Sequence, residues 1–539
     1  MQHPSARLQR IRLPAILAGF GTLASVQRAR LPVVLAAVCA LPILLYLPLL
    51  HEPLARDEGF YAAVGQRILH GDLPYRDAFD NKPPIVFGWY ALSFLIFGEQ
   101  VWAPRLVAAV LVSLTTLLVY VQGRLLFSGR EALLAALAFA LSIGVATFGT
   151  NANTEYFMLL PLVAGLVTFT LGHQTGRLRW FLVSGVLNGI AIMTKEVSLF
   201  NLGFLVLWTL YPAWRRGELD RRHLSSVALL LGGCSLAVAL TIAPFVVMGA
   251  FGDFWDAAVV YTLHYLGANS PFDRIIGFVN LVVFPSSYAG PWVVLPLLGF
   301  VYLMSRGEDR WQWLVPGWLV AGVISIVFLG RLYAHYFVHI LPALSLMVPF
   351  GVRFLRQTWH SAPRRVAVYG LLIAASAAGT VLLNAQVYLH PSVKEENLAV
   401  LTNDYQDYWY LASPALAQYV ADNTSPDARI YNLGFQSELY FYSDRRSPTR
   451  YMFDHLFVAD GGLVEAALRD LEEKPPVLII DSARYSPARA YGYDRAPFDR
   501  FLAQRYQYLG KLYYADVYRL KESPTARFHR KVISLGEAS

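Results

Sequence analysis

Residues 31–61 read LPVVLAAVCALPILLYLPLLHEPLARDEGFY. The first twenty of them carry no charge, and roughly twenty apolar residues in a helix can cross the hydrocarbon core of a bilayer. Each backbone amide in that core must be hydrogen-bonded within its own segment, so this run is predicted to be a membrane-spanning helix. Arg56, Asp57 and Glu58 follow where the chain would leave the membrane.

The same apolar pattern recurs along the chain. With 539 residues, of which 56% are hydrophobic and 15% charged, the chain carries more apolar surface than one soluble core encloses. We predict a membrane all-α fold, a bundle of about eleven transmembrane helices. The predicted spans are 31–50, 101–121, 132–150, 156–171, 180–194, 197–214, 224–251, 288–304, 311–329, 336–354 and 366–388.

Arginine collects in alternate loops between these spans, and this pattern predicts the orientation. Basic residues in short loops stay on the cytoplasmic side, so the N-terminal segment 1–30 is predicted to be cytoplasmic, with an uncleaved interfacial helix over 13–26. An odd number of spans then places 389–539 outside the cytoplasm. The net charge of +8 is spread over these loops and forms no stripe with stacking aromatics, which argues against nucleic-acid binding.

The C-terminal part, 389–539, has the composition of a soluble domain. Helical periodicity covers 413–423 and 463–473, whereas 429–433 and 477–481 resemble strands and 506–520 a closing strand pair. A small extracytoplasmic α/β domain is therefore predicted. It lacks a glycine-rich phosphate loop, so its sequence gives no indication of nucleotide binding.

The first outer loop, within 51–100, has the densest set of polar residues. Acidic residues at the exit of a membrane helix, with a lysine before a double proline, can form a site at the lipid surface; the alternative is a solvated interfacial loop. The apolar segment 85–97 is too short to span and is interpreted as an amphipathic interfacial helix. The loop residues concerned are Arg56, Asp57, Glu58, Asp77, Asp80, Asn81, Lys82, Pro83 and Pro84.

The second outer loop, 150–155, places Glu155 at the mouth of a span. A carboxylate bordering hydrocarbon is costly, which makes it a functional candidate. Alternatively Asn153 or Thr154 caps the following helix, with Glu155 favoured by the helix dipole. Lys195 and Glu196 form a third polar point, for which a structural pair in a tight turn is the simpler interpretation.

The fifth outer loop contains Arg331, Tyr333 and His335. Arginine presents a planar fork of donors suited to phosphate oxygens, and tyrosine hydroxyls add further donors. An aromatic belt at the membrane boundary is the alternative explanation for the tyrosines. The arginine is harder to explain in that way, because it lies on the side where basic residues are scarce.

Several of these motifs together resemble the glycosyltransferase family 39 superfamily, which includes the protein O-mannosyltransferases and the aminoarabinose transferases. The resemblance covers roughly 31–388, and its most specific part is the first loop. The motifs that carry it are Asp57-Glu58, Gly71-Asp72-Leu73-Pro74-Tyr75, Lys82-Pro83-Pro84, Phe97-Gly98 with Trp102 and Arg105, Asn153-Thr154-Glu155, and the segment 331–337.

The resemblance implies a GT-C fold and transfer of a sugar from a polyprenyl-phosphate donor to a glycan, lipid or protein acceptor at the outer face of the bacterial inner membrane, with inversion. It implies catalytic roles for Asp57, Glu58 and Glu155. It also implies that Lys82 contacts the donor phosphate. Asn81 stands where aminoarabinose transferases commonly carry an acid, so no cofactor is assigned and a divalent metal ion stays an open option.

The chemistry of the residues agrees with that implication. The phosphate of such a donor is itself the leaving group, so the reaction needs a base for the acceptor's proton and cations for the phosphate. Asp57 can supply the first, and Lys82 and Arg331 the second, with Tyr333 and His335 as further phosphate contacts. A transporter or flippase is the competing class; it would favour internal repeats and charges at mid-bilayer, which the sequence lacks. A binding protein would leave the loop acids unexplained.

Overall fold

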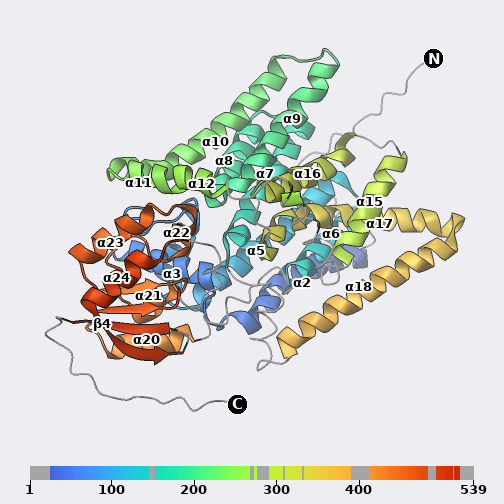
Figure 1. Cartoon of the computed structure of the whole chain (residues 1–539). Coiled ribbons are helices and arrows are strands. Elements are labelled where there is room, and N and C mark those ends of the chain that lie inside the picture. The colour runs from blue at the N-terminus through green and yellow to red at the C-terminus, as the bar shows by residue number, and fades with distance from the viewer. Residues whose placement is uncertain are drawn as a thin grey trace. The chain divides into compact units, whose positions relative to one another are not determined.

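The computed structural model describes residues 25–144, 152–266, 272, 274, 275, 279, 291–306, 310–329, 333–389, 412–483, 493–513 and 515–521 (Figure 1). The chain divides into two compact units. Unit 1 comprises Met1–Glu52 and Asn81–Tyr405, and unit 2 comprises Pro53–Asp80 and Gln406–Ser539. The first predicted outer loop is therefore split, and most of it folds together with the C-terminal part of the chain.

The described residues of unit 1 form helices joined by short connections. Each of the eleven predicted spans overlaps one of its helices, which confirms the helical reading of the apolar runs. The longer helices are α2 (Ser25–Tyr46), α4 (Ile85–Phe97), α5 (Trp102–Leu126), α6 (Gly129–Ser142), α7 (Thr154–Thr175), α8 (Arg179–Thr194), α9 (Leu199–Arg215), α10 (Arg221–Val247), α15 (Pro291–Arg306), α16 (Leu314–Leu329), α17 (Leu341–Ser361) and α18 (Pro363–Leu389). Shorter pieces are η2 (Leu47–Leu49), η4 (Glu196–Ser198), α11 (Phe251–Trp255), η5 (Asp256–Tyr261), α12 (Thr262–Leu266), η6 (Arg310–Trp313) and η7 (Ala334–Ile340).

Within the described residues, seven helical segments are long and apolar enough to cross a membrane: Leu31–Leu49, Trp102–Leu126, Thr154–Thr175, Glu196–Arg215, Arg221–Val247, Trp311–Phe328 and His335–Trp359. Three further apolar helices are shorter, namely Ile85–Phe97, Arg179–Thr194 and Val293–Ser305. The chain is a multi-pass membrane protein, whereas the count of eleven spans stays a prediction. The predicted interfacial helix at 13–26 lies outside the described residues.

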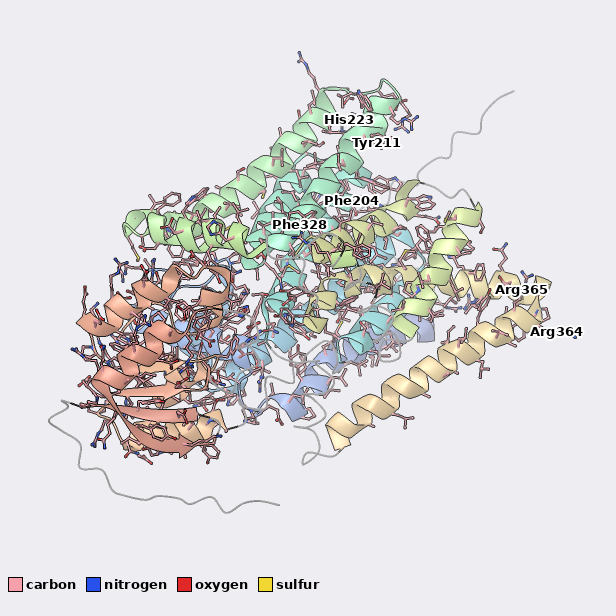
Figure 2. The ribbon with its side chains drawn as sticks, in the orientation of Figure 1. Phe204, Tyr211, His223, Phe328, Arg364 and Arg365 are labelled. Carbon is pink, nitrogen blue, oxygen red and sulfur yellow. The ribbon has the colours of Figure 1, made fainter. Side chains whose placement is uncertain are left out.

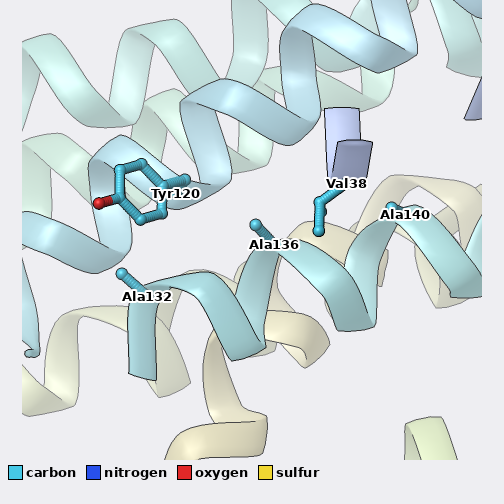
Figure 3. Packing of buried hydrophobic residues seen from close by; sticks show 5 residues of the cluster. All are labelled: Val38, Tyr120, Ala132, Ala136 and Ala140. Atoms are coloured by element: carbon cyan, nitrogen blue, oxygen red, sulfur yellow. The ribbon is translucent and has the colours of Figure 1, made fainter. Parts of the chain in front are cut away.

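Small side chains let the membrane helices pack closely. Ala132, Ala136 and Ala140 follow one another along one face of α6 and contact Val38 of α2 and Tyr120 of α5 (Figure 3). Helices α8 and α10 approach even more closely at Gly185, where an added Cβ would overlap the carbonyl of Leu230. Lipid tails are as apolar as leucine, so close packing of this kind holds membrane helices together.

Several basic residues of unit 1 lie at helix ends. Figure 2 shows Arg364 and Arg365 where α18 meets α17, and His223 and Tyr211 near the adjoining ends of α10 and α9. Charges in these positions stay out of the hydrocarbon core, as the positive-inside rule presumes. The side of the membrane on which each end lies stays a prediction.

The interpretation of 85–97 as an amphipathic helix is wrong in one respect. The helix forms, as α4, but it has no polar face: Tyr90 and Ser93 are buried, whereas Leu95 and Ile96 are exposed. A helix that exposes leucine and isoleucine suits contact with lipid more than with the water interface.

Unit 2 contains a four-stranded sheet in the order β1-β2-β4-β3, formed by β1 (Ile430–Leu433), β2 (Leu478–Asp481), β3 (Tyr506–Leu512) and β4 (Ala515–Leu520). Strands β1 and β2 are parallel, with Ile430 opposite Leu478, and the other two pairings are antiparallel. The two parallel strands, β1 and β2, are buried along their whole length. The helices are α3 (Arg56–Leu69), α20 (Ser413–Asp422), α21 (Glu438–Ser443), α22 (His455–Ala459), α23 (Leu463–Glu473) and α24 (Ala496–Arg505).

The strands and helices predicted in the C-terminal part are confirmed, α23 to the residue. Helix α3 was not predicted. It packs against α21 at Gly59, where an added Cβ would overlap both the Cβ and the backbone of Glu438, so glycine is required there.

Candidate functional site

A buried ion pair at one end of a membrane helix is the centre of the candidate site in unit 1. Glu155 lies in the first turn of α7, and Lys195 follows the last residue of α8. The ammonium of Lys195 donates to Oε1 of Glu155, and the hydroxyl of Thr154 donates to Oε2 at 3.1 Å. The side chains are only 1% and 4% exposed. Buried charges persist when they are paired and hydrogen-bonded, as these are.

Aromatic residues of η7 border this pair. Nε2 of His335 lies 3.9 Å from Oε1 of Glu155, and the ammonium of Lys195 lies 4.1 Å from the centre of the Tyr336 ring. The rings of Tyr333 and His335 stack with their centroids 5.6 Å apart. The structure thus brings Glu155, Tyr333 and His335 into one cluster, while Arg331 lies outside the described residues.

A second polar network lies in the same bundle. His339 is buried, with Nε2 at 2.7 Å from Oδ1 of Asn201 and Nδ1 at 3.2 Å from the hydroxyl of Ser325. These residues were not among the candidates predicted from the sequence. Histidine and asparagine inside apolar spans are uncommon enough to have served as a signal.

The alternatives considered for the second loop are resolved in part. Asn153 occupies the N-cap of α7 but makes no side-chain capping bond, and its buried Oδ1 has no partner among the described residues. Lys195 pairs with Glu155, so the reading of Lys195 and Glu196 as a local structural pair is wrong. The helical hairpin of α7 and α8 is the reason, because it returns the chain to the start of α7.

Lys82 lies just before α4. Its ammonium donates to Oδ1 of Asn81 at 3.0 Å, and the carbonyl of Asn81 accepts a bond from the Thr262 hydroxyl at 3.3 Å. The side chain of Lys82 is half-buried. Arg105, from a motif of the resemblance, donates to the carbonyls of Leu49 and Glu52, where the first span ends.

Asp57 and Glu58 belong to unit 2 and have different environments. Glu58 is buried, and its Oε2 accepts from the backbone N–H of Ala55 at 3.2 Å, as a capping carboxylate does at a helix start. Asp57 is 30% exposed, with Oδ1 at 3.4 Å from Nε of Arg56. The guanidinium of Arg56 lies over the Phe435 ring, 5.4 Å from its centre. Asp57 is therefore the carboxylate of the two that a substrate can reach.

Among the described residues, no cluster of three or more His, Cys, Asp or Glu side chains is arranged to hold a metal ion. The assignment of a metal therefore stays open, as it did from the sequence.

Glu438, behind α3, gives unit 2 a pH dependence. Burial raises its pKa to about 7, against the hydrogen bond that it accepts from Ser413 at 2.5 Å. The pKa of Glu438 is higher in the folded state than in the unfolded state, so the protonated carboxyl stabilises the fold fully below about pH 4.5. This stabilisation is lost as the pH rises through about 7, which lowers the free energy of unfolding by on the order of 3 kcal/mol. We expect strand β1 to exchange its amide hydrogens faster at pH 8 than at pH 5.5, after correction for intrinsic rates.

Glu438→Gln should reduce this pH difference, whereas Glu465→Gln, at an exposed position of α23, should leave it unchanged. An equal pH difference in the wild type and Glu438→Gln would contradict the assignment. Asp454 adds to the same trend, since burial, followed by the nearby Asp481 carboxylate, raises its pKa to about 7.

Comparisons with known proteins point to one class. Residues 81–247 match the family model described as dolichyl-phosphate-mannose-protein mannosyltransferase. An undecaprenyl phosphate-alpha-4-amino-4-deoxy-L-arabinose arabinosyl transferase of Pseudomonas fluorescens is 24% identical over 80% of this chain and 81% of its own length. An uncharacterised protein of Aquifex aeolicus is 28% identical over 54% of this chain and 67% of its own.

The fold has solved counterparts as well. The crystal structure of ArnT from Cupriavidus metallidurans bound to undecaprenyl phosphate superposes with a TM-score of 0.56 at 16% identity, covering 92% of this chain and 98% of that one. The chain is thus similar to membrane glycosyltransferases, and these likenesses do not favour the transporter or flippase alternative.

Proposed function

We propose that this chain, as a GT-C glycosyltransferase of the superfamily that includes the protein mannosyltransferases and the aminoarabinose transferases, moves a sugar from a polyprenyl-phosphate donor to an acceptor at the outer face of the membrane. The observation that carries this proposal is the buried ion pair of Glu155 and Lys195, bordered by the partly buried His335, at the start of α7. Ionisable groups buried at the end of a membrane span are costly to keep and serve substrates more often than packing.

The reaction is a single displacement. The acceptor hydroxyl attacks the anomeric carbon of the donor, and the bond from that carbon to the phosphate oxygen breaks with its electron pair left on the phosphate. The acceptor's proton passes to Asp57, and one displacement inverts the configuration at the anomeric carbon. Cations stabilise the charge that develops on the leaving phosphate.

We assign the residues accordingly. Asp57 is the base, and Glu58 supports the helix on which Asp57 lies. Glu155 orients Lys195 through the buried ion pair, which keeps a cation in a membrane environment. The predicted donor-phosphate contacts are Lys82, Arg331, Tyr333 and His335. In cellular terms we place the N-terminus in the cytoplasm and 389–539 outside it, in the inner membrane of a bacterial cell.

Lys82→Ala and Arg331→Ala should each weaken donor binding, by on the order of 2–5 kcal/mol where the phosphate contact is desolvated and by less where water reaches it. A phosphodiester at the bilayer edge needs such partners, because a desolvated anion without them is strongly unfavourable. Fluorescence quenching by a polyprenyl phosphate, with protein in nanodiscs, gives the affinity.

Arg216→Ala is the matched control, because Arg216 is an exposed cation paired with Glu218 at 2.8 Å. It should leave donor affinity unchanged. Unchanged donor affinity in Lys82→Ala would remove Lys82 from the phosphate site, and the same outcome for Arg331→Ala would remove Arg331.

The proposed function itself is tested by incubating the purified chain with a panel of polyprenyl-phosphate sugars and following donor consumption. We expect at least one donor to be consumed when an extract of cell-envelope glycans and lipids is supplied as acceptor. The donors in the panel differ only in their sugar, so the donor that is consumed also identifies the sugar that the chain transfers.

A further inference from the structure

Unit 2 has a cavity of about 660 Å³, open to solvent, between its two chain segments. One wall comes from the end of α3 and the turn that follows it, and the other from residues 445–452 and α23. Cavities of roughly 300–1,000 Å³ accommodate small-molecule and sugar ligands. This one belongs to unit 2 alone and contains none of the residues assigned above to the transfer reaction.

The lining of the cavity is strongly basic. It includes eight cationic side chains against four acidic ones, an excess of four positive charges. The cations are Arg67, Arg76, Arg429, Arg445, Arg446, Arg450, Arg469 and Lys474, and the acids are Asp72, Asp77, Asp470 and Glu473. A lining of this kind excludes a lipid tail, which would need apolar walls, and suits a polar anion.

Several of the acids are already engaged. Asp77 accepts from the backbone N–H of Leu73 at 2.7 Å and from Nη2 of Arg76 at 2.7 Å. Asp470 accepts from the Thr449 hydroxyl at 2.7 Å. These bonds fix the walls of the cavity, and the ion pair of Asp77 with Arg76 leaves one acid fewer to balance the remaining arginines.

Three of the arginines have no carboxylate partner among the residues that the structure describes. Arg445 is only 7% exposed, yet its guanidinium donates only to carbonyl and hydroxyl oxygens, among them Ser443 O at 2.7 Å and Thr424 Oγ1 at 2.9 Å. Arg429 and Arg469 are exposed, and their side chains have no ion pair or hydrogen bond with any residue that the structure describes. Like charges held together without counterions create a site that an anion stabilises.

The turn that forms one wall is held in an uncommon conformation. Tyr75 has φ of +72°, in the left-handed region, although it is not glycine, and its side chain is fully buried. Its backbone N–H donates to Ala78 O at 2.8 Å, and its carbonyl accepts from Nη1 of Arg450 at 3.4 Å. A residue stays in this region only where its surroundings enforce it, so the wall has a fixed shape.

We propose that this cavity binds phosphate or carboxylate groups carried by the glycan of the sugar acceptor. The proposal rests on the proposed function, since it names the chemical class of the acceptor. Arginine forks bind either anion in a bidentate manner, and a cavity of this volume holds one or two sugar rings with their charged substituents. The acceptor would then be selected by charge in unit 2.

Tripolyphosphate, a soluble polyanion, is the probe, titrated calorimetrically into the full-length chain in a neutral maltoside detergent. We expect binding tighter than about 1 mM at low salt that weakens steeply as salt rises. The double variant Arg429→Gln/Arg469→Gln should weaken it roughly tenfold to a hundredfold. Arg500→Gln, at an exposed position of α24 that does not line the cavity, is the matched control and should bind as the wild type does.

Two further arms separate the alternatives. Lys82→Ala should keep its tripolyphosphate affinity, and the double variant should keep its affinity for the polyprenyl-phosphate donor, so failure of this proposal is distinct from failure of the proposed function. Absence of tripolyphosphate binding, or equal affinity in the double variant and Arg500→Gln, would overturn it. A further arm uses protein in neutral nanodiscs and asks whether it floats with phosphatidylglycerol vesicles. Flotation that depends on the two arginines, without binding of the soluble anion, would also overturn the proposal, because the arginines would then contact a membrane surface.

Discussion

Asp57→Asn is expected to abolish sugar transfer, lowering kcat by roughly 10²–10⁴-fold while the protein stays folded and still binds the donor. The exchange keeps the shape of the side chain and removes only its basicity. Asp57 lies 3.4 Å from Nε of Arg56, and its side chain is partly exposed at the start of α3. The measurement is single-turnover transfer with the productive donor, alongside donor affinity.

Glu58→Gln, one residue further along α3, is the internal control. Glutamine can still accept the hydrogen bond from Ala55, so this variant should keep most of its kcat and lose some thermal stability of unit 2. Near-normal turnover in Asp57→Asn would remove the base assignment. The opposite ranking, with Glu58→Gln inactive and Asp57→Asn active, would transfer that role to Glu58.

Lys195→Met is expected to destabilise unit 1 by on the order of 3–5 kcal/mol, because it leaves the carboxylate of Glu155 buried without its cation. The side chain of Glu155 is 1% exposed, and water cannot replace the lost partner. The effect is measured by heating the detergent-solubilised protein and recording the temperature at which half of the protein has aggregated. Transfer activity should be lost as well, since Glu155 no longer orients a cation.

The double variant Glu155→Gln/Lys195→Met should recover much of the stability, because no uncompensated charge remains, but not the activity. Arg216→Met provides a matched control: it breaks the exposed pair with Glu218, and exposed pairs contribute about 0–1 kcal/mol. A Lys195→Met protein as stable as Arg216→Met would show that the pair is not buried in the native membrane protein.

The apolar runs made the membrane helices of unit 1 predictable. The alternation of short strand and helix patterns did the same for β1, β2 and α23. Helix α3 was missed although Asp57 and Glu58 occupy its first turn and Gly71 follows its end, both of which are helix boundary signals. The segment lies between two predicted spans, so it was interpreted from its charged residues as a loop and its helical periodicity was not considered.

Other features depend on contacts that a single sequence does not reveal. The packing of Gly59 against Glu438 joins segments that are distant in the chain, so the assignment of Pro53–Asp80 to unit 2 had no local signal. The pairing of Glu155 with Lys195 also joins distant residues, but it could have been predicted from the order of the helices. Two consecutive antiparallel helices with a short connection bring the start of the first to the end of the second, and that rule alone would have predicted it.

The central claim is that the chain cleaves a polyprenyl-phosphate sugar rather than moving it across the membrane. The most direct test reconstitutes the chain in liposomes with its productive donor and counts, by mass spectrometry, the polyprenyl phosphate released for each sugar transferred. We predict one polyprenyl phosphate for each sugar in the wild type and none in Asp57→Asn. Intact donor appearing in the opposite leaflet, without release of polyprenyl phosphate, would contradict the account and favour a flippase.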